Sequence, residues 1–203
     1  NALGRLDDAA LAVKLLTTSD RETAQQISAQ LERLNDLRKQ LQDQIVGAAL
    51  AQVEKDPALL DFEALVLAGE NWHAGVLGIV AARLVELYNR PAVVLTCPPG
   101  EPARGSARSV PGVDIGAAIA ACADLLVSHG GHPGAAGLAL DPDLIPQFRR
   151  RLSNAIAKTR DPSVRPVQQV DAVVSLADVT DAFAAELNRL APFGEGNPPV
   201  QVM

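Results

Sequence analysis

The segment from Gly130 to Gly137 has the composition of a ligand-binding loop. In order, its residues are Gly130, Gly131, His132, Pro133, Gly134, Ala135, Ala136 and Gly137. Glycines leave backbone amides uncovered and small side chains let a sugar or phosphate approach closely, while His132 can donate or accept a hydrogen bond. We therefore predict a pocket for a small anionic or nucleotide ligand. A tight structural turn that binds nothing accounts for the same glycines equally well.

Ser106 and Arg108 form a second candidate group for binding. They lie two positions apart in the segment 105–109, so both would point to one face if this segment is a strand. A hydroxyl and a guanidinium on one face can hold a terminal phosphate. An edge strand with a solvated arginine is the alternative. The turn at Pro111-Gly112 and the helix expected to begin at Asp114 favour the binding interpretation.

His73 is a third candidate, at the start of a helix predicted for residues 74–89. The free backbone N–H groups of a helix start can meet a polar ligand, and a histidine there can take part. A capping or packing role is the alternative. Gly75 and Gly78, which follow, would let this helix pack closely against a strand or another backbone.

Catalytic groups are harder to find than binding groups. Metal-assisted hydrolysis needs several carboxylates or histidines that converge on one point, whereas the adjacent pair Asp7-Asp8 diverges on a helix and suits its N-terminus. Cys97 and Cys122 have no second cysteine or histidine at metal-ligand spacing, so we interpret them as free thiols. The pattern Gly-x-Ser-x-Gly does not occur, which argues against Ser-His-Asp catalysis. We expect no metal ligand in this chain.

The composition is that of a globular protein with a modest negative charge. The 203 residues are 48% hydrophobic and 3% aromatic, and the formal net charge is −6. This charge argues against a broad duplex-binding face, and the few aromatic residues argue against a long stacking platform for single strands. Nucleic acid would therefore bind in a local pocket. No apolar run is long enough to cross a membrane, so we expect a cytoplasmic protein.

A long helix is predicted for residues 20–54. Apolar side chains recur there at helical spacings, at positions Ile27, Leu31, Leu34, Leu41, Ile45 and Ala48. At a rise of about 1.5 Å per residue the helix would be on the order of 50 Å long, which suits a connector between two domains. A coiled-coil arm is the alternative. A shorter helix is expected over residues 7–16.

Strands and helices alternate over residues 62–160, which predicts an α/β domain. The expected strands are 65–69, 92–96, 103–109 and 138–140. The expected helices are 74–89, 114–127 and 143–159. Residues 130–137 are expected to form a loop. After a linker at 161–166, we predict a strand within 168–177 and a helix near 181–190.

Four motifs, in this order, resemble the RecJ family of single-strand-specific DNA exonucleases in the DHH phosphoesterase superfamily. They are Trp72-His73-x-Gly75-Val76-x-Gly78-Ile79-Val80-Ala81-x-Arg83-Leu84, Gly105-Ser106-x-Arg108-Ser109, Gly130-Gly131-His132-Pro133-x-Ala135-Ala136-Gly137 and Pro192-Phe193-Gly194-x-Gly196-Asn197-Pro198. The start, from Asn1 to Leu6, is similar to the segment that closes the DHH domain of that family. The resemblance implies four parts. Residues 1–19 end the DHH catalytic domain, 20–56 form the connector helix, 62–160 form a small mixed-sheet DHH-associated domain, and 161–203 are a linker and the start of an oligonucleotide-binding domain.

The resemblance also implies a function. Members of this family degrade single-stranded DNA from its 5′ end in repair and recombination. By this resemblance Arg5, Ser106 and Arg108 contact the 5′ phosphate, and the segment from Gly130 to Gly137, with His132, contacts DNA near the scissile nucleotide. The complete set of candidate substrate-binding residues is Arg5, His73, Ser106, Arg108, Gly130, Gly131, His132, Ala135, Ala136 and Gly137.

Manganese or magnesium in such an enzyme is held by the DHH domain, so we expect the metal to bind outside this chain. The chain starts at Asn1 and its sole methionine is Met203, so we expect part of a longer enzyme that is inactive alone. One alternative is part of a DHH-family oligoribonuclease or cyclic-dinucleotide phosphodiesterase, against which the motif at Pro192–Pro198 argues. Another is a noncatalytic interaction module. The exposed connector helix is also expected to allow self-association.

Overall fold

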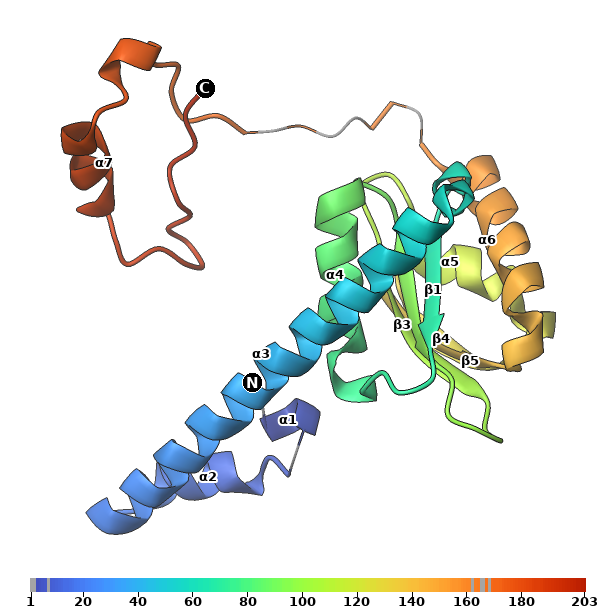
Figure 1. Cartoon of the computed structure of the whole chain (residues 1–203), viewed down its shortest axis with the longest axis horizontal. Helices are drawn as coiled ribbons and strands as arrows, with labels where there is room; N and C mark the ends of the chain where they lie inside the picture. Colours follow the sequence, from blue (N-terminus) through green and yellow to red (C-terminus); the bar gives the residue numbers. More distant parts are fainter. Residues whose placement is uncertain (1–2, 7, 162, 165–166, 168) are drawn as a thin grey trace. The chain divides into compact units, whose positions relative to one another are not determined.

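The computed structural model shows a five-stranded sheet with helices on both faces (Figure 1). The structure describes residues 3–6, 8–161, 163–164, 167 and 169–203. Predictions that concern Asn1, Ala2, Asp7 and part of the 161–166 linker lie outside these residues. The chain forms two compact units, residues 1–165 and 166–203. All five strands belong to the first unit.

The sheet is mixed and has the strand order β1-β2-β3-β5-β4. Its strands are β1 (Leu65–Gly69), β2 (Ala92–Thr96), β3 (Ala103–Arg108), β4 (Leu126–His132) and β5 (Ala135–Leu140). β1 and β2 pair in parallel, whereas the other neighbours are antiparallel. A parallel pair needs a crossover connection, which the 3-10 helix η2 (Ala74–Val76) and helix α4 (Leu77–Tyr88) supply. The predicted α/β class with a mixed sheet is confirmed.

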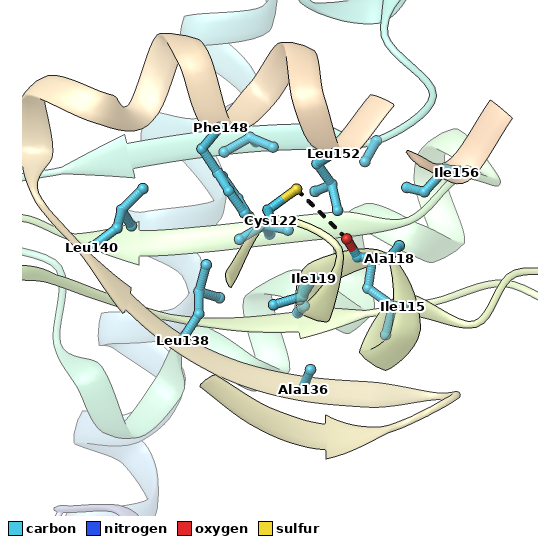
Figure 2. Close-up of a cluster of buried hydrophobic side chains, with 14 of the residues drawn as sticks. Ile115, Ala118, Ile119, Cys122, Ala136, Leu138, Leu140, Phe148, Leu152 and Ile156 are labelled. Carbon is cyan, nitrogen blue, oxygen red and sulfur yellow. Dashed lines mark hydrogen bonds between the residues drawn. The ribbon is translucent and has the colours of Figure 1, made fainter. Parts of the chain in front are cut away.

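Side chains from the two faces of the sheet build two cores. Neighbouring residues of β2 show the division, because Val94 packs with α4 and the C-terminal half of helix α3 (Arg21–Lys55), whereas Val93 and Leu95 pack on the other face. Figure 2 shows that second core, where α5 (Ile115–Ala120) and α6 (Ile145–Thr159) cover the sheet. A strand covered on both faces is a continuous apolar run, as 92–95 is in the sequence.

The long helix is confirmed as α3, which begins after Asp20 and ends before Pro57. The Asp20 carboxylate accepts a hydrogen bond from the backbone N–H of Thr23 at 2.8 Å, which caps the first turn. The apolar stripe is partly covered: Ile27 is 5% exposed and Ile45 is 4% exposed. The short helices α1 (Leu3–Leu6) and α2 (Ala10–Thr17) pack against α3. The described part of the predicted 7–16 helix therefore belongs mainly to α2.

The region around the glycine-rich segment differs from its prediction. The helix expected over 114–127 ends at Ala120, a 3-10 turn η3 (Ala123–Leu125) follows, and β4 begins at Leu126. The expected loop at 130–137 is a hairpin whose strands β4 and β5 meet at Pro133-Gly134. Glycines are poor strand formers in isolation, so the signal was weak. The ladder to β5 fixes them as a strand by tertiary pairing.

The second unit contains 3-10 helix η5 (Leu176–Asp178) and helix α7 (Asp181–Asn188), which confirms the helix predicted near 181–190. The strand predicted within 168–177 is wrong for the described residues there, which contribute a single bridge between Ala172 and Val202. Asn197 organises the turn that follows α7. Its side-chain amide donates to the carbonyls of Leu190 and Pro192, both at 3.0 Å.

Among the described residues, no helix combines the length and the apolar character that crossing a membrane requires.

Candidate nucleic-acid interface

One face of strands β3, β5 and β4 brings the predicted binding residues together. Side chains alternate along a strand, so Ser106 and Arg108 point to the same side of β3, toward the α4 side of the sheet. In the ladder, Arg108 pairs with Ala135, which pairs with His132 of β4. These three residues form a first row across the sheet.

Ser106 starts a second, parallel row of smaller residues. It pairs with Gly137, which pairs with Gly130 of β4. Both glycines are exposed, because α4 packs on β2 and β3 whereas α5 packs on β4 and β5 from the other side. The two rows therefore define an open face. Its floor has no side chain larger than a methyl group between Arg108 and His132, which lie about 10 Å apart at a strand spacing of roughly 4.8 Å.

Not every predicted contact lies on the open face. Ala136 points the other way and is 7% exposed, packed in the core that α5 and α6 cover (Figure 2). Its predicted contact with substrate is therefore not supported by its position. Gly131 pairs with Ala136 and belongs to that side as well. A Cβ atom at Gly131 would lie 2.4 Å from the Ala135 carbonyl oxygen, so this glycine allows the two strands to approach.

Backbone hydrogen bonds tie the tip of the hairpin to the end of β3. The Ser109 N–H donates to the Gly134 carbonyl and the Ile115 N–H donates to the Pro133 carbonyl, both at 3.1 Å. The Ser109 hydroxyl also donates to the Val113 carbonyl at 2.8 Å. These bonds hold the turn beside the start of α5, and thereby fix His132 relative to Arg108.

His132 is exposed at the end of β4, and one ring nitrogen has an internal partner. Its Nδ1 accepts a hydrogen bond from the Gly134 N–H at 3.3 Å. This bond orients the imidazole and leaves Nε2 as the nitrogen that can meet a ligand. The exposed Nε2 of His132 is therefore open to a ligand, and its neighbour in the ladder, Ala135, offers no side-chain functional group.

Arg108 is half-buried at the corner where β3 meets α4. Its Nη1 donates to the Ala107 carbonyl at 2.8 Å, and its guanidinium lies directly over Gly78 of α4. Desolvation lowers the pKa of Arg108, and the positive charge of Arg5 lowers it further. Arg108 still carries its charge at neutral pH, because an arginine does not lose its proton in proteins. It is therefore a partly desolvated cation that is repelled by the positive charge of Arg5.

Arg5 reaches the same corner from α1. Its Nη1 donates to the Gly75 carbonyl in η2 at 3.4 Å. Within the described part of the chain, neither Arg5 nor Arg108 forms an ion pair with a carboxylate. The charge of Arg5 acts on Arg108 strongly enough to lower its pKa, so an anion at this corner would relieve the repulsion between them.

His73 caps a helix, which was the alternative to a ligand contact for this residue. Its Nδ1 accepts a hydrogen bond from the Gly75 N–H at 3.1 Å and so begins η2. The side chain is exposed close to the Arg5 contact, because both histidine and arginine bond to Gly75. Its structural task is therefore explained, and its predicted contact with substrate stays a prediction.

Sequence reasoning overlooked part of the open face. Arg104 and Ser128 form a third row with Ala139, and they line a hollow of about 290 Å³ at the opposite end from His132. The alternation of β3 would have revealed Arg104. Ser128 lay in a stretch predicted to follow a helix, and only the hairpin shows its place.

Residues 3–6, 8–161, 163–164, 167 and 169–203 contain no group of three histidine, cysteine, aspartate or glutamate side chains that could hold a metal ion. Cys97 is half-buried and Cys122 is buried, both as free thiols. Burial raises the pKa of each thiol. They are therefore poor candidates for thiolate ligands.

Known proteins share both the sequence pattern and the fold of this chain. The DHHA1 domain family matches residues 61–158. The single-stranded-DNA-specific exonuclease RecJ of Bacillus subtilis is 38% identical over 100% of this chain and 26% of its own length. The RecJ of Thermus thermophilus is 35% identical over 98% of this chain and 28% of its own length. Residues 61–158 are a DHHA1 domain, and the chain matches one segment of RecJ over its whole length.

Solved RecJ structures share the fold. The crystal structure of Thermus thermophilus RecJ in complex with Mg²⁺ matches 98% of this chain and 30% of that chain, with a TM-score of 0.76 and 36% identity. An exonuclease RecJ bound to manganese matches 80% of this chain and 40% of that chain, with a TM-score of 0.68. The chain thus spans well under half the length of its RecJ relatives. A likeness to a pGpG-specific phosphodiesterase, at a TM-score of 0.37 and 11% identity, gives the alternative no support.

The two adjacent glycines of β4 give a matched pair of variants for the hairpin. Gly131→Ala places a Cβ atom against the backbone of β5, whereas Gly130→Ala has nothing within 4 Å. We predict that Gly131→Ala lowers the free energy of unfolding by about 1–3 kcal/mol, as overpacking does, and that Gly130→Ala changes it by less than about 0.5 kcal/mol. Urea denaturation of both variants measures the difference. Equal stability of the two variants would contradict the hairpin.

Proposed function

We propose that this chain provides the DNA-end-binding surface of a RecJ-type exonuclease that degrades single-stranded DNA from its 5′ end. The observation that carries the proposal is the corner where Arg5 and Arg108 meet without a carboxylate partner among the described residues. A 5′ phosphate supplies the negative charge that this corner lacks. RecJ relatives, named as single-stranded-DNA-specific exonucleases, support this substrate class.

In this proposal each row of the open face has a separate task. Arg5 and Arg108 hold the terminal phosphate. The Ser106 hydroxyl, which lies on the same face of β3 as Arg108, donates a hydrogen bond to it. Gly130, Gly137 and Ala135 form a floor on which a sugar can lie close to the backbone. His132, about 10 Å from Arg108, contacts the DNA farther along.

The parts of the chain take the tasks that their positions in RecJ imply. We propose that residues 1–19 end the DHH catalytic domain and that 20–56 connect it to the next domain. The DHH-associated domain then extends over 62–160, consistent with the DHHA1 match to residues 61–158. Residues 161–203 are proposed as a linker and the start of the oligonucleotide-binding domain. Limited proteolysis that cleaves first within 161–168 would support the last boundary.

Metal ions would complete the reaction from outside this chain. The two RecJ crystal structures contain Mg²⁺ and manganese, whereas the described residues here have no group of ligands that fits either ion. We infer that residues elsewhere in the parent enzyme hold the metal. This chain contributes the surface that binds the DNA end. Because its proposed substrate is cellular DNA, we place it in the cytoplasm, which cell fractionation can test.

The 203-residue chain alone should therefore bind single-stranded DNA without cutting it. We predict no release of nucleotides from a labelled oligonucleotide in the presence of Mn²⁺ or Mg²⁺. Gel electrophoresis over several hours measures cleavage, with the full-length enzyme as the positive control. Robust metal-dependent cleavage by this chain would refute the placement of the metal elsewhere.

The 5′-phosphate site predicts a large effect of one arginine. Replacing Arg108 with alanine removes a charge-assisted contact, so binding of a 5′-phosphorylated oligonucleotide should weaken by about 1.5–3 kcal/mol. Binding of the same oligonucleotide with a 5′ hydroxyl should change little. Fluorescence anisotropy at one fixed salt concentration measures both affinities.

Arg150 provides a matched control for this variant. It is exposed on α6, on the other side of the sheet from the open face. Arg150→Ala changes the net charge as Arg108→Ala does, and we expect it to leave the preference for a 5′ phosphate intact. If both variants lose affinity equally, the arginines act through overall charge and not through a phosphate site.

We separately propose self-association through α3. Less of its apolar stripe is exposed than the sequence suggests. Ile27 and Ile45 are covered within the chain, but Leu37 on α3 is 46% exposed and Leu16 on α2 is 85% exposed. We predict a dimer at high protein concentration, and a shift toward monomer in Leu37→Lys. Static light scattering measures the mass. A wild-type monomer at high concentration would contradict this proposal.

A further inference from the structure

Gly78 lies under the guanidinium of Arg108 and is itself buried at the start of α4. A Cβ atom at this position would lie 2.7 Å from Nη2 of Arg108, 3.3 Å from Cζ and 3.6 Å from Nη1. All three nearest atoms belong to the same guanidinium. The missing side chain of Gly78 therefore makes the space in which the Arg108 head group rests.

Gly75, one turn earlier, has the same relation to α1. A Cβ atom there would lie 1.9 Å from the backbone oxygen of Arg5. Gly75 lies in η2, and Gly78 follows three residues later at the start of α4. The two glycines thus form adjacent seats, one for the backbone that carries Arg5 and one for the head group of Arg108.

The two seats differ in what a substitution would move. At Gly75 the neighbour is backbone, so a larger residue must displace α1 as a whole. At Gly78 the neighbour is the end of a long, flexible side chain, which can swing away at little cost to the fold. Glycine within a helix is less favourable than alanine, so helix stability does not explain Gly78. Its contact with Arg108 does.

We propose that Gly78 is a positioning residue that determines the specificity of this surface for a 5′-phosphorylated end. It does not touch the DNA. It keeps the Arg108 guanidinium at the corner beside Arg5, where both charges meet one phosphate. Any side chain at position 78 displaces the guanidinium and removes discrimination between a 5′ phosphate and a 5′ hydroxyl. This inference rests on the proposed function, since it assumes that Arg108 binds that phosphate.

The test compares Gly78→Ala with Gly47→Ala in this chain. Gly47 lies in α3 with nothing within 4 Å of a Cβ atom, so it controls for a glycine-to-alanine change in a helix. For each variant, anisotropy gives the affinity ratio between 5′-phosphorylated and 5′-hydroxyl oligonucleotides of one sequence. We expect Gly78→Ala to lower this ratio at least tenfold, with an unchanged or higher thermal midpoint. Gly47→Ala should keep the wild-type ratio.

A second measurement follows Arg108 without any DNA. The side-chain Nε–H resonance of Arg108 in an NMR spectrum, assigned with Arg108→Lys, should shift in Gly78→Ala and stay in place in Gly47→Ala. An unchanged resonance in Gly78→Ala would overturn the seating of the guanidinium.

The binding results distinguish a failure of the phosphate site from a failure of the role of Gly78. A wild-type chain that binds both oligonucleotides equally overturns the phosphate site and the specificity role together. If wild type prefers the phosphate, Arg108→Ala loses that preference and Gly78→Ala retains it, the proposed function stands and the role of Gly78 is overturned.

Discussion

The antiparallel pairing of β3 with β5 is the constraint on which the rest of the site depends. It sets Arg108 opposite Ala135 and Ser106 opposite Gly137, and the pairing of β5 with β4 then adds His132 and Gly130. A slip of one residue would turn Ala136 to the open face and bury Ala135 and Gly137 in its place. Phe148 and Leu152 of α6 prevent that slip, because they pack in the core that receives Ala136, Leu138 and Leu140 (Figure 2). The apolar core on one face thus sets the register of the polar groups on the other.

Much of this fold could be predicted from the sequence because its signals are local. The apolar runs 65–69 and 92–96 and the long helix begin and end where capping residues and prolines indicate. The hairpin could not be predicted in the same way. Gly130, Gly131 and Gly137 are typical of turns, and their strand conformation depends on partners that are distant or small. The strand expected within 168–177 shows the reverse case. Its composition favours a strand, but the described residues there have only a single bridge partner, so no strand forms.

The shared face of Ser106 and Arg108 was predictable from the sequence, whereas the arrangement of the other candidate residues was not. The spacing of Ser106 and Arg108 indicated a shared face, and β3 has that form. The division of 135–137 between two faces required the hairpin, so the sequence could not separate Ala136, which faces the core, from its neighbours. The meeting of Arg5 with Arg108 joins residues about a hundred positions apart, and no periodicity in the sequence indicates it. It is also compatible with the proposed phosphate site in a chain of net charge −6, because the positive charge is local.

The glycines of β4 have a consequence for solubility. β4 is an outer strand of the sheet and almost all of it is exposed. Such a strand presents backbone N–H and C=O groups to which another chain could add, a common start of aggregation. Two glycines within β4 lower its β-propensity, and the irregular register with β5 between Leu126 and Ser128 distorts the strand. Gly130, which keeps the floor of the open face low, therefore also helps to make this edge a poor template for unwanted strands.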